Sequence, residues 1–334
     1  MKNLISIILV FGVMLLAIPA VALYKKPAQT KDDSSSKIIK KDVRVEALKE
    51  PEVYKMLDTK TNTIFEIKPR DYVIGAVFAQ MPANFEKEAL KSQAIIAHTY
   101  ILRQHETVVQ NSLPDLMGAD FSNNFNMYQA YFNAEQAKSL YGDEYNTNLK
   151  KISEAVDEVM KKVVTYNGSL ISPAFHSMSG GMTESAKNAW GTDLPYLQPV
   201  KSDGETKEKG FSETKTFSAE EISTRLKQDY KDIKLGEDKS QWLKVGDKSE
   251  SGTVLTLTAG DKTIKGSDLK SILSLRSCNF EISFKDDTFT IVSKGVGHGV
   301  GFSQYGANAM AKSGSTYDKL LSYYYTGIKI EDIK

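Results

Sequence analysis

Two short segments rich in glycine, histidine and serine carry the residues best suited to chemistry. Residues 175–191 read FHSMSGGMTESAKNAWG, and residues 295–308 read GVGHGVGFSQYGAN. Together they hold two of the four histidines in a chain of 334 residues. Paired glycines let backbone N–H groups approach a ligand closely, and imidazole groups can bind it or move protons. We therefore expect the segments to line one shared groove, although each taken alone fits a tight turn equally well.

Several kinds of site could be built from these side chains. A serine–histidine hydrolase would use Ser177 or Ser179, but the G-x-S-x-G turn of such enzymes is absent. A zinc site would join the two histidines to a carboxylate such as Asp203, but no short ligand spacing supports it. The glycine order does not match a phosphate-binding loop. A groove for a sugar polymer needs amides, hydroxyls and aromatic rings. The chain offers Gln304, Tyr305, Trp190 and Tyr196.

Composition narrows the classes of protein. The net charge is +1, so no strong basic field indicates nucleic-acid binding. Cys278 is the single cysteine, and one thiol cannot form an internal disulfide or a cysteine-rich zinc site. With 41% hydrophobic residues, the chain is long enough to bury one or two cores.

The N-terminal stretch, residues 3–24, carries no charged side chain. At about 1.5 Å per residue, a helix of this length can span a bilayer. A cleaved signal peptide is the alternative, because Ala20, Val21 and Ala22 fit a processing site, but its apolar core would exceed the usual roughly 7–15 residues. We expect residues 1–24 to be a transmembrane anchor or signal-like leader, with the body of the chain outside the cytoplasm.

The elements that must position the two segments follow a polar linker. Residues 25–42 are charged and serine-rich, which is typical of a flexible tether, and residues 43–334 have globular patterns. Residues 86–104 contain strong helix formers and no glycine or proline. Apolar residues recur there at helical spacing, namely Leu90, Ala94, Ala97 and Ile101.

The C-terminal half adds hairpins and short helices. Alternating patterns predict hairpins over residues 253–266 and 279–299, and Ser218 with Glu221 forms a capping box that begins a helix. Helix, turn and helix are expected after residue 306. Interleaved helices and antiparallel hairpins indicate an α+β fold around a substrate groove.

Four motifs in order carry a resemblance to a known family. They are YVIGAVFAQMPANFEKEALKSQAIIAHTY (72–100), FHSMSGGMTESAKNAWG-TDLPYL (175–197), LRS (275–277) and GHGVGFSQYGANAMAKSGSTYDKLLSYYYTG (297–327). Together they resemble the stage II sporulation protein D family of endospore-forming bacteria. The resemblance covers roughly Lys41 to the C-terminus, plus the leader.

The resemblance implies a single-pass protein of the cell membrane, its body extracytoplasmic and facing the space between mother cell and forespore. It implies a peptidoglycan lytic transglycosylase, which cuts glycan strands during engulfment in sporulation. The implied partners are the stage II sporulation proteins P, an amidase, and M, a membrane protein. One acid would protonate the leaving oxygen and then deprotonate the 6-hydroxyl of muramic acid, which attacks its own ring.

The resemblance also implies the site residues. The catalytic acid of the family is a glutamate before Met-Pro, and the matching position here is Gln80. Ten residues would line the substrate groove: Lys91, His176, Ser177, Ser179, Gly180, Thr183, His298, Ser303, Gln304 and Tyr305.

Gln80 is the departure that matters, because an amide can donate a hydrogen bond but cannot cycle a proton at neutral pH. The alternative function is therefore a catalytically impaired glycan-binding or scaffold member of the engulfment complex. Glu86, Glu88 and Glu184 are the carboxylates weighed as substitutes, with Glu88 more simply a structural helix residue.

We expect neither a metal nor any other cofactor. For some members of the family the resemblance implies a zinc site after a Gly-Ala-Asp segment, but here Ser122, Met127 and Tyr128 fall where its ligands would lie. His105, late on the predicted helix, is expected at the surface.

Overall fold

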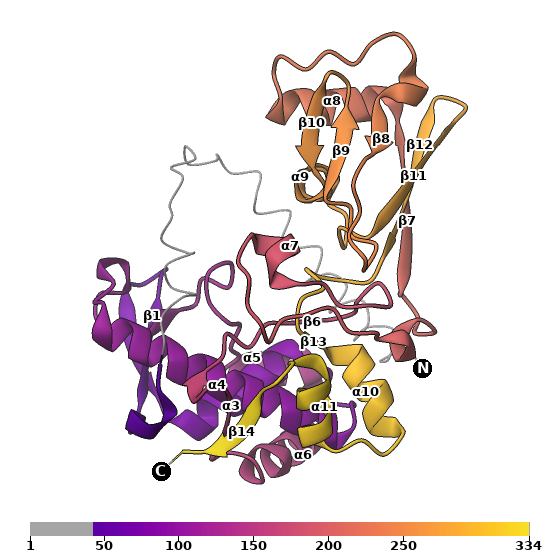
Figure 1. The fold of residues 1–334 in the computed structure, drawn as a ribbon. Coiled ribbons are helices and arrows are strands. Elements are labelled where there is room, and N and C mark those ends of the chain that lie inside the picture. Colours follow the sequence, from indigo (N-terminus) through magenta and orange to yellow (C-terminus); the bar gives the residue numbers. More distant parts are fainter. Residues whose placement is uncertain (1–42, 334) are drawn as a thin grey trace. The chain divides into compact units, whose positions relative to one another are not determined.

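The computed structural model describes residues 43–333, so the expected anchor and linker lie outside the described residues. Where the sequence predicts one domain over 43–334, chain contacts divide the protein into two compact units (Figure 1). Unit 1 runs to Pro173 and takes in Thr316–Asp318 and the chain from Gly327 onward, and unit 2 comprises Ala174–Ser315 and Lys319–Thr326. Within residues 43–333, no helix has the length and apolar character needed to cross a bilayer.

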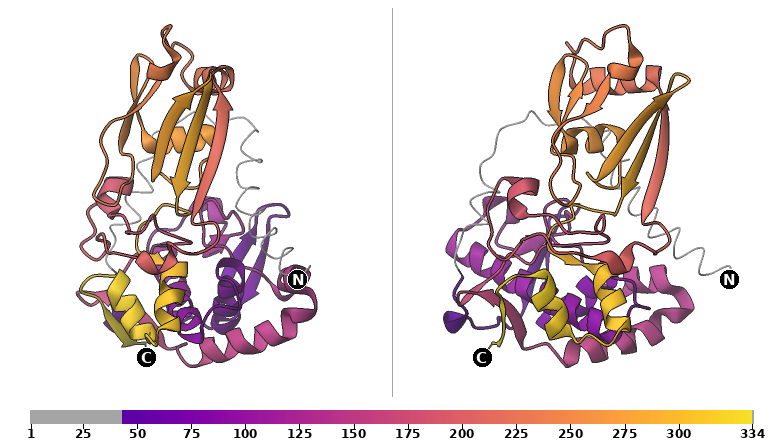
Figure 2. Two further views of the ribbon diagram at one scale, coloured as in Figure 1. Left: turned by 90° about the vertical axis from the view of Figure 1, so that its right-hand side faces the viewer. Right: turned by 45° about the vertical axis from the view of Figure 1, so that its right-hand side comes forward.

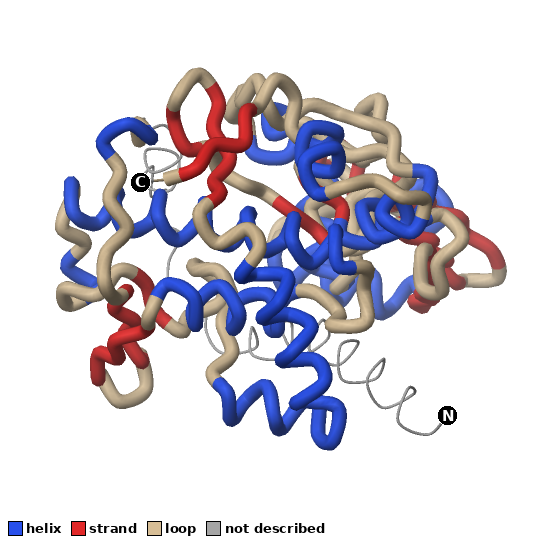
Figure 3. Tube along the Cα trace, turned by 90° about the horizontal axis from the view of Figure 1, so that it is seen from below, coloured by secondary structure: helices blue, strands red, loops and turns tan. Residues whose placement is uncertain are grey.

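Unit 1 is mostly helical. Figure 3 draws the helices of the described chain in blue and its strands in red. Its helices are α3 (Pro69–Gln80), α4 (Lys87–Gln110), α5 (Ala134–Tyr141) and α6 (Tyr145–Asp157). The helix predicted over 86–104 is confirmed as α4, which continues for six residues more. Its predicted apolar stripe is buried. That stripe packs α4 against its neighbours α3 and α6.

Two small sheets complete unit 1. In the first, β1 (Tyr54–Asp58) pairs antiparallel with β2 (Thr63–Ile67) and parallel with β3 (Phe121–Ser122). In the second, β4 (Lys162–Tyr166) lies between β5 (Ser169–Leu170) and the C-terminal β14 (Lys329–Asp332). Three-residue 3₁₀ turns lie at Val45–Ala47, Pro114–Leu116 and Gly142–Glu144.

Unit 2 contains two three-stranded antiparallel sheets, and the strands of one of them lie side by side in the left view of Figure 2. That sheet has the order β11 (Phe280–Lys285), β12 (Thr288–Lys294), β7 (Ser212–Ser218). The other has the order β10 (Lys262–Lys265), β9 (Thr256–Ala259), β8 (Leu243–Val245). Their apolar faces and the helices α8 (Ala219–Asp229) and α9 (Gly266–Leu273) share one core. Both predicted hairpins are confirmed, as β9–β10 and β11–β12.

The rest of unit 2 is made of loops and short elements. These are β6 (Phe175–His176), α7 (Ala186–Trp190), β13 (Phe302–Ser303) and α10 (Gln304–Lys312), with 3₁₀ turns at Asp203–Glu205 and Lys239–Gln241. The helix α11 (Tyr317–Tyr324) begins in unit 1 and ends in unit 2. Helices alternate with largely antiparallel strands in both units, which confirms the α+β class. The capping box is confirmed as well, because Ser218 and Glu221 exchange hydrogen bonds at the start of α8.

Candidate functional site

The two glycine-rich segments lie side by side in unit 2. The strands β6 and β13 pair in parallel, which sets Phe302 beside Phe175 and Ser303 beside His176. The backbone N–H of Tyr305 donates to the carbonyl of Ser177 at 3.1 Å, which continues the contact beyond the strands. Backbone hydrogen bonds therefore join the two predicted halves of the site.

The second segment follows a path that only glycine adopts easily. Its glycines at positions 295, 297, 299 and 301 all have positive φ. At Gly301 φ is +73°, and a Cβ atom would lie 2.2 Å from the carbonyl oxygen of Ala174. That carbonyl also accepts the N–H of Phe302 and the hydroxyl of Tyr325. The bare backbone at position 301 is what allows β13 to approach β6.

Gly301→Ala is expected to destabilise unit 2 by about 2–4 kcal/mol, because left-handed backbone strain adds to a steric clash. Gly314→Ala is the matched control, since φ there is +92° and nothing lies within 4 Å of the added Cβ. Chemical denaturation followed by circular dichroism measures both. Equal losses in the two variants would contradict the close-approach explanation.

His176, the second residue of β6, is buried, with 4% of its surface exposed. Its Nδ1 donates to the carbonyl of Val300 at 3.1 Å, which leaves Nε2 as the unprotonated nitrogen. Within the described chain, Nε2 is buried and has no hydrogen-bond partner. Burial and the neighbouring His298 lower the pKa of His176 to about 3, so the ring is neutral at physiological pH.

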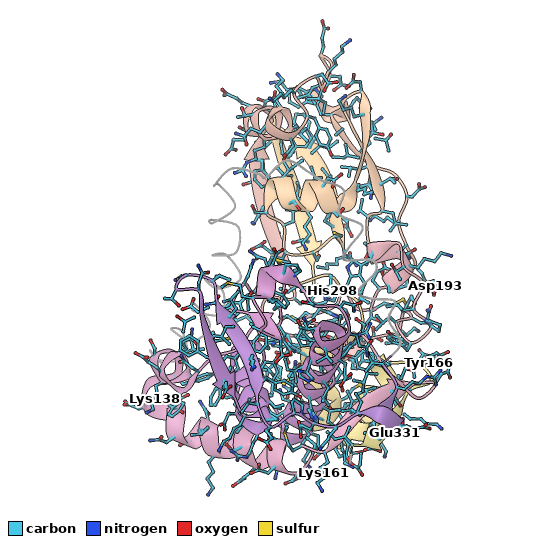
Figure 4. The ribbon with its side chains drawn as sticks, turned by 90° about the vertical axis from the view of Figure 1, so that its left-hand side faces the viewer. Lys138, Lys161, Tyr166, Asp193, His298 and Glu331 are labelled. Carbon is cyan, nitrogen blue, oxygen red and sulfur yellow. The ribbon has the colours of Figure 1, made fainter. Side chains whose placement is uncertain are left out.

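His298, labelled in Figure 4, lies in the loop after β12. Its Nδ1 accepts the backbone N–H of Val300 at 3.0 Å. The residue is exposed, and desolvation by neighbouring atoms, with the charge of Lys270, lowers its pKa below the ordinary histidine value. The ring centroids of His298 and His176 are 5.8 Å apart, and Trp190 packs edge-on against His298 at 5.1 Å. Trp190 is 41% exposed, which gives the site an aromatic surface that solvent and ligands can reach.

A small pocket borders His298. It is lined by Gly297 and Gly299 from one segment and by Ser179 and Gly180 from the other. At Gly180 an added Cβ would lie 2.2 Å from Nδ2 of Asn279, so the close approach that this glycine permits is to a protein side chain.

Glu205 is the residue of this region that the sequence analysis missed. It is fully buried, and its carboxyl group accepts the hydroxyls of Ser179 at 2.6 Å and Ser303 at 2.5 Å. Burial raises its pKa, and the hydrogen bonds from these serines oppose that rise only in part. Both serines were expected to contact substrate. The structure instead gives their hydroxyls a protein acceptor that ties the two segments together.

Other expected groove residues also have protein partners. Thr183 is buried, and its hydroxyl accepts the N–H of Val200 at 2.9 Å. Gln304 is buried in the first turn of α10, whereas Tyr305 and Ser177 are partly exposed. Direct contact of these side chains with a ligand stays a prediction.

Glu184, one of the possible substitutes for the catalytic acid, is buried and surrounded by hydrogen-bond donors. Its Oε1 accepts the N–H of Ser185 at 2.8 Å and Nδ2 of Asn188 at 3.0 Å, and its Oε2 accepts the hydroxyls of Ser249 and Ser251. Burial raises the pKa of Glu184, but these hydrogen bonds outweigh it, and the net pKa is lowered. A carboxylate held ionised in this way is a poor proton donor.

Gln80 and Lys91 belong to unit 1, while the other expected site residues belong to unit 2. Gln80 ends α3, and its Nε2 donates to the carbonyl oxygen of Ala130 at 2.9 Å. Lys91 forms ion pairs with Glu88 at 2.7 Å and Glu158 at 2.5 Å, so its ammonium group already has two anionic partners. A shared groove that includes Gln80 stays a prediction.

His105 lies elsewhere in unit 1 and corrects the expectation of a plain surface residue. Its side chain is 20% exposed, and Nδ1 donates to Oδ1 of Asp120 at 2.7 Å. This hydrogen bond raises the pKa of His105, and burial opposes it. The described chain contains no cluster of three or more His, Cys, Asp or Glu side chains that could hold a metal ion.

The His105–Asp120 pair predicts a pH-dependent contribution to stability. A raised folded pKa adds stability that is fully present below the unfolded value near 6.5 and is lost as pH rises through the folded pKa. The difference in unfolding free energy between wild type and His105→Gln is therefore expected to be larger at pH 5.5 than at pH 9. Denaturant titrations at both values measure it. The same difference at the two pH values would contradict the expected stabilisation of the cation.

Comparisons with known proteins agree on one family. A family model described as stage II sporulation protein matches residues 57–166. The chain is 39% identical over 274 residues to stage II sporulation protein D of Bacillus subtilis (strain 168), covering 82% of this chain and 77% of that protein. It is 36% identical over 275 residues to the protein of that name from Bacillus amyloliquefaciens, with the same coverage. It is also 29% identical over 310 residues to the amidase enhancer of Bacillus subtilis, covering 76% of this chain and 39% of that protein.

Proposed function

Because the chain belongs to the stage II sporulation protein D family, we propose that it acts on the glycan strands of peptidoglycan during sporulation. Trp190 is the observation that carries the glycan part of the proposal. Its indole is exposed and packs edge-on against the ring of His298. Rings of this kind pack against the apolar faces of sugars while nearby imidazole and amide groups bind their hydroxyls.

The proposed reaction class is that of a lytic transglycosylase, in which one acid/base group serves both steps. Position 80 is where the family resemblance puts that group. The carbonyl of Ala130 faces the side chain of residue 80 and accepts a hydrogen bond from it. A protonated carboxylic acid could donate this bond and an ionised carboxylate could not, so the surroundings suit an acid kept neutral until it reacts.

Gln80 donates this hydrogen bond at every pH. Its amide cannot act as the acid, because it does not release a proton at neutral pH. We therefore propose that this chain binds glycan strands and cuts them far more slowly than a form with glutamate at position 80. Three other carboxylates have structural partners that support this view. Glu88 pairs with Lys91 and accepts the N–H of Tyr317, Glu184 is held by hydroxyls, and Glu205 is fully buried.

The cellular location and the partner proteins are also part of the proposal. Residues 1–24 would anchor the protein in the cell membrane, with the body extracytoplasmic between mother cell and forespore. The stage II sporulation proteins P and M would be partners, with the amidase acting on the strands first. The relative named an amidase enhancer supports an association with an amidase.

Sedimentation of the protein with peptide-free glycan strands tests the binding proposal. Wild type is expected to sediment with the strands, and Trp190→Ala to bind about tenfold more weakly, which corresponds to about 1.4 kcal/mol. Phe65→Ala is the matched control, because Phe65 is a similarly exposed aromatic residue on β2. Absence of wild-type binding would overturn the proposal, as would equal losses in the two variants.

A further inference from the structure

A pocket of about 330 Å³ opens in unit 1 between β1 and the last turns of α4, elements that lie side by side in Figure 1. This volume lies within the range of sites for small ligands. Its polar lining includes Lys55, His105 and Asp120, and its apolar lining includes Val108, Val109 and Leu113. None of these residues belongs to the site proposed for glycan strands.

Asp120 fixes the orientation of the histidine in this pocket. Its Oδ2 accepts the backbone N–H of Lys55 at 2.7 Å, and its Oδ1 accepts Nδ1 of His105 at 2.7 Å. The side-chain amide of Gln104 donates to its backbone carbonyl at 2.8 Å. Since Nδ1 is committed to Asp120, Nε2 is the ring nitrogen of His105 that remains for a ligand.

The charges of the lining favour an anion. Asp120 is 6% exposed and accepts both donors described above, so a protonated His105 balances its charge and Lys55 leaves the lining with one net positive charge. The side chain of Lys55 is exposed, and no ion pair engages it in the described chain. Lys55 and His105 both line the pocket, so an ammonium group and a protonated imidazole are the charged donors that its lining offers. Compact, charge-assisted hydrogen bonding of this kind suits a carboxylate.

The apolar side of the pocket indicates what the ligand carries next to its carboxylate. Val108 and Val109 follow His105 on α4, and 66% of the surface of Val109 is exposed. Leu113 continues this wall beyond the helix. The pocket is also larger than a bare carboxylate needs. An aliphatic side chain next to the carboxylate would cover this surface and remove it from water.

We propose that this pocket binds the C-terminal carboxylate of a peptide that ends in a small aliphatic residue. The carboxylate lies between Nζ of Lys55 and Nε2 of His105. The terminal aliphatic group lies against Val108 and Val109. This inference goes beyond the proposed function, and a failure of glycan binding leaves it intact.

Isothermal titration of the full chain in detergent tests the proposal with acetyl-alanyl-alanine as the probe. The same peptide with a C-terminal amide and the free acids acetate and isobutyrate are the comparison ligands. The acid peptide is expected to bind at least tenfold more tightly than each of the three. Equal affinity for the amide would overturn the carboxylate assignment, and equal affinity for isobutyrate would overturn the peptide assignment.

Two variants test the residues. Lys55→Gln and His105→Gln are each expected to weaken binding of the acid peptide at least fivefold. Lys60→Gln, an exposed lysine in the β1–β2 turn, is the matched control and is expected to leave affinity unchanged. Thermal melts establish that all three variants are folded. An equal loss in Lys60→Gln, or full affinity in both pocket variants, would overturn the proposal.

Discussion

Gln80→Glu is expected to raise the rate of glycan-strand cutting about 10²–10⁴-fold, the usual contribution of a general acid/base. The two side chains have nearly the same shape, so α3 and the contact with Ala130 should persist. Only the capacity to give up and take back a proton changes. Release of soluble fragments from peptide-free strands measures the rate.

The Ala130 carbonyl adds a pH signature to this prediction. The amide nitrogen of Gln80 lies 2.9 Å from that oxygen. A neutral carboxyl group in its place could donate a hydrogen bond to the oxygen, whereas an ionised carboxylate would be repelled by it. The pKa of the introduced group is therefore expected above the ordinary glutamate value near 4.3. Protonation of the leaving oxygen needs the acid form, so the rate should fall as pH rises through that pKa.

Asn84→Glu is the control for the added negative charge. Asn84 is exposed and lies four residues beyond position 80, after the Met-Pro turn. It is expected to leave the rate at the wild-type level. A comparable gain in Asn84→Glu would contradict a specific role for position 80, and an unchanged rate in Gln80→Glu would contradict the proposed proton transfer there.

Glu205→Ala is expected to lower the free energy of unfolding by about 3 kcal/mol or more. The substitution leaves the buried hydroxyls of Ser179 and Ser303 without their acceptor and opens a cavity. Relief of the cost of burying the carboxyl group offsets part of this loss. Because the two serines belong to the two glycine-rich segments, glycan binding should fall along with stability.

Glu205→Gln and Glu250→Ala make this second prediction specific. The amide oxygen of the glutamine variant can accept one of the two hydroxyls, so its loss should be smaller than that of Glu205→Ala. Glu250 is exposed, and its replacement should change stability by less than about 0.5 kcal/mol. Denaturant unfolding of the three variants measures the order. A Glu205→Ala protein as stable as Glu250→Ala would contradict the structural role.

Local patterns of sequence predicted the elements well. The stripe from Leu90 to Ile101, the capping box at Ser218 and the two hairpins each depend on residues within a few positions of one another, and all appear in the structure. The adjacency of the two glycine-rich segments was also foreseen, from their shared composition. The parallel pairing of β6 with β13, which produces it, has no local signal.

The residues that sequence reasoning missed depend on long-range contacts. Glu205 sits in the stretch KSDGETKEKG, where every acidic residue has the pattern of a solvated one. Its burial is set by Ser179 and Ser303, which lie 26 and 98 positions away. The roles of Ser179 and Ser303 depend on the same contacts, since a sequence does not show which hydroxyls find a protein acceptor first.

Analysis of the products of the wild-type chain tests the central claim most directly. Peptide-free glycan strands are incubated with wild type and with Gln80→Glu, and mass spectrometry counts the 1,6-anhydro ends that intramolecular cleavage leaves. Wild type is expected to bind the strands and release such ends at least about 100-fold more slowly than the variant. Release by wild type at the rate of the variant would contradict the claim that the amide at position 80 limits cutting.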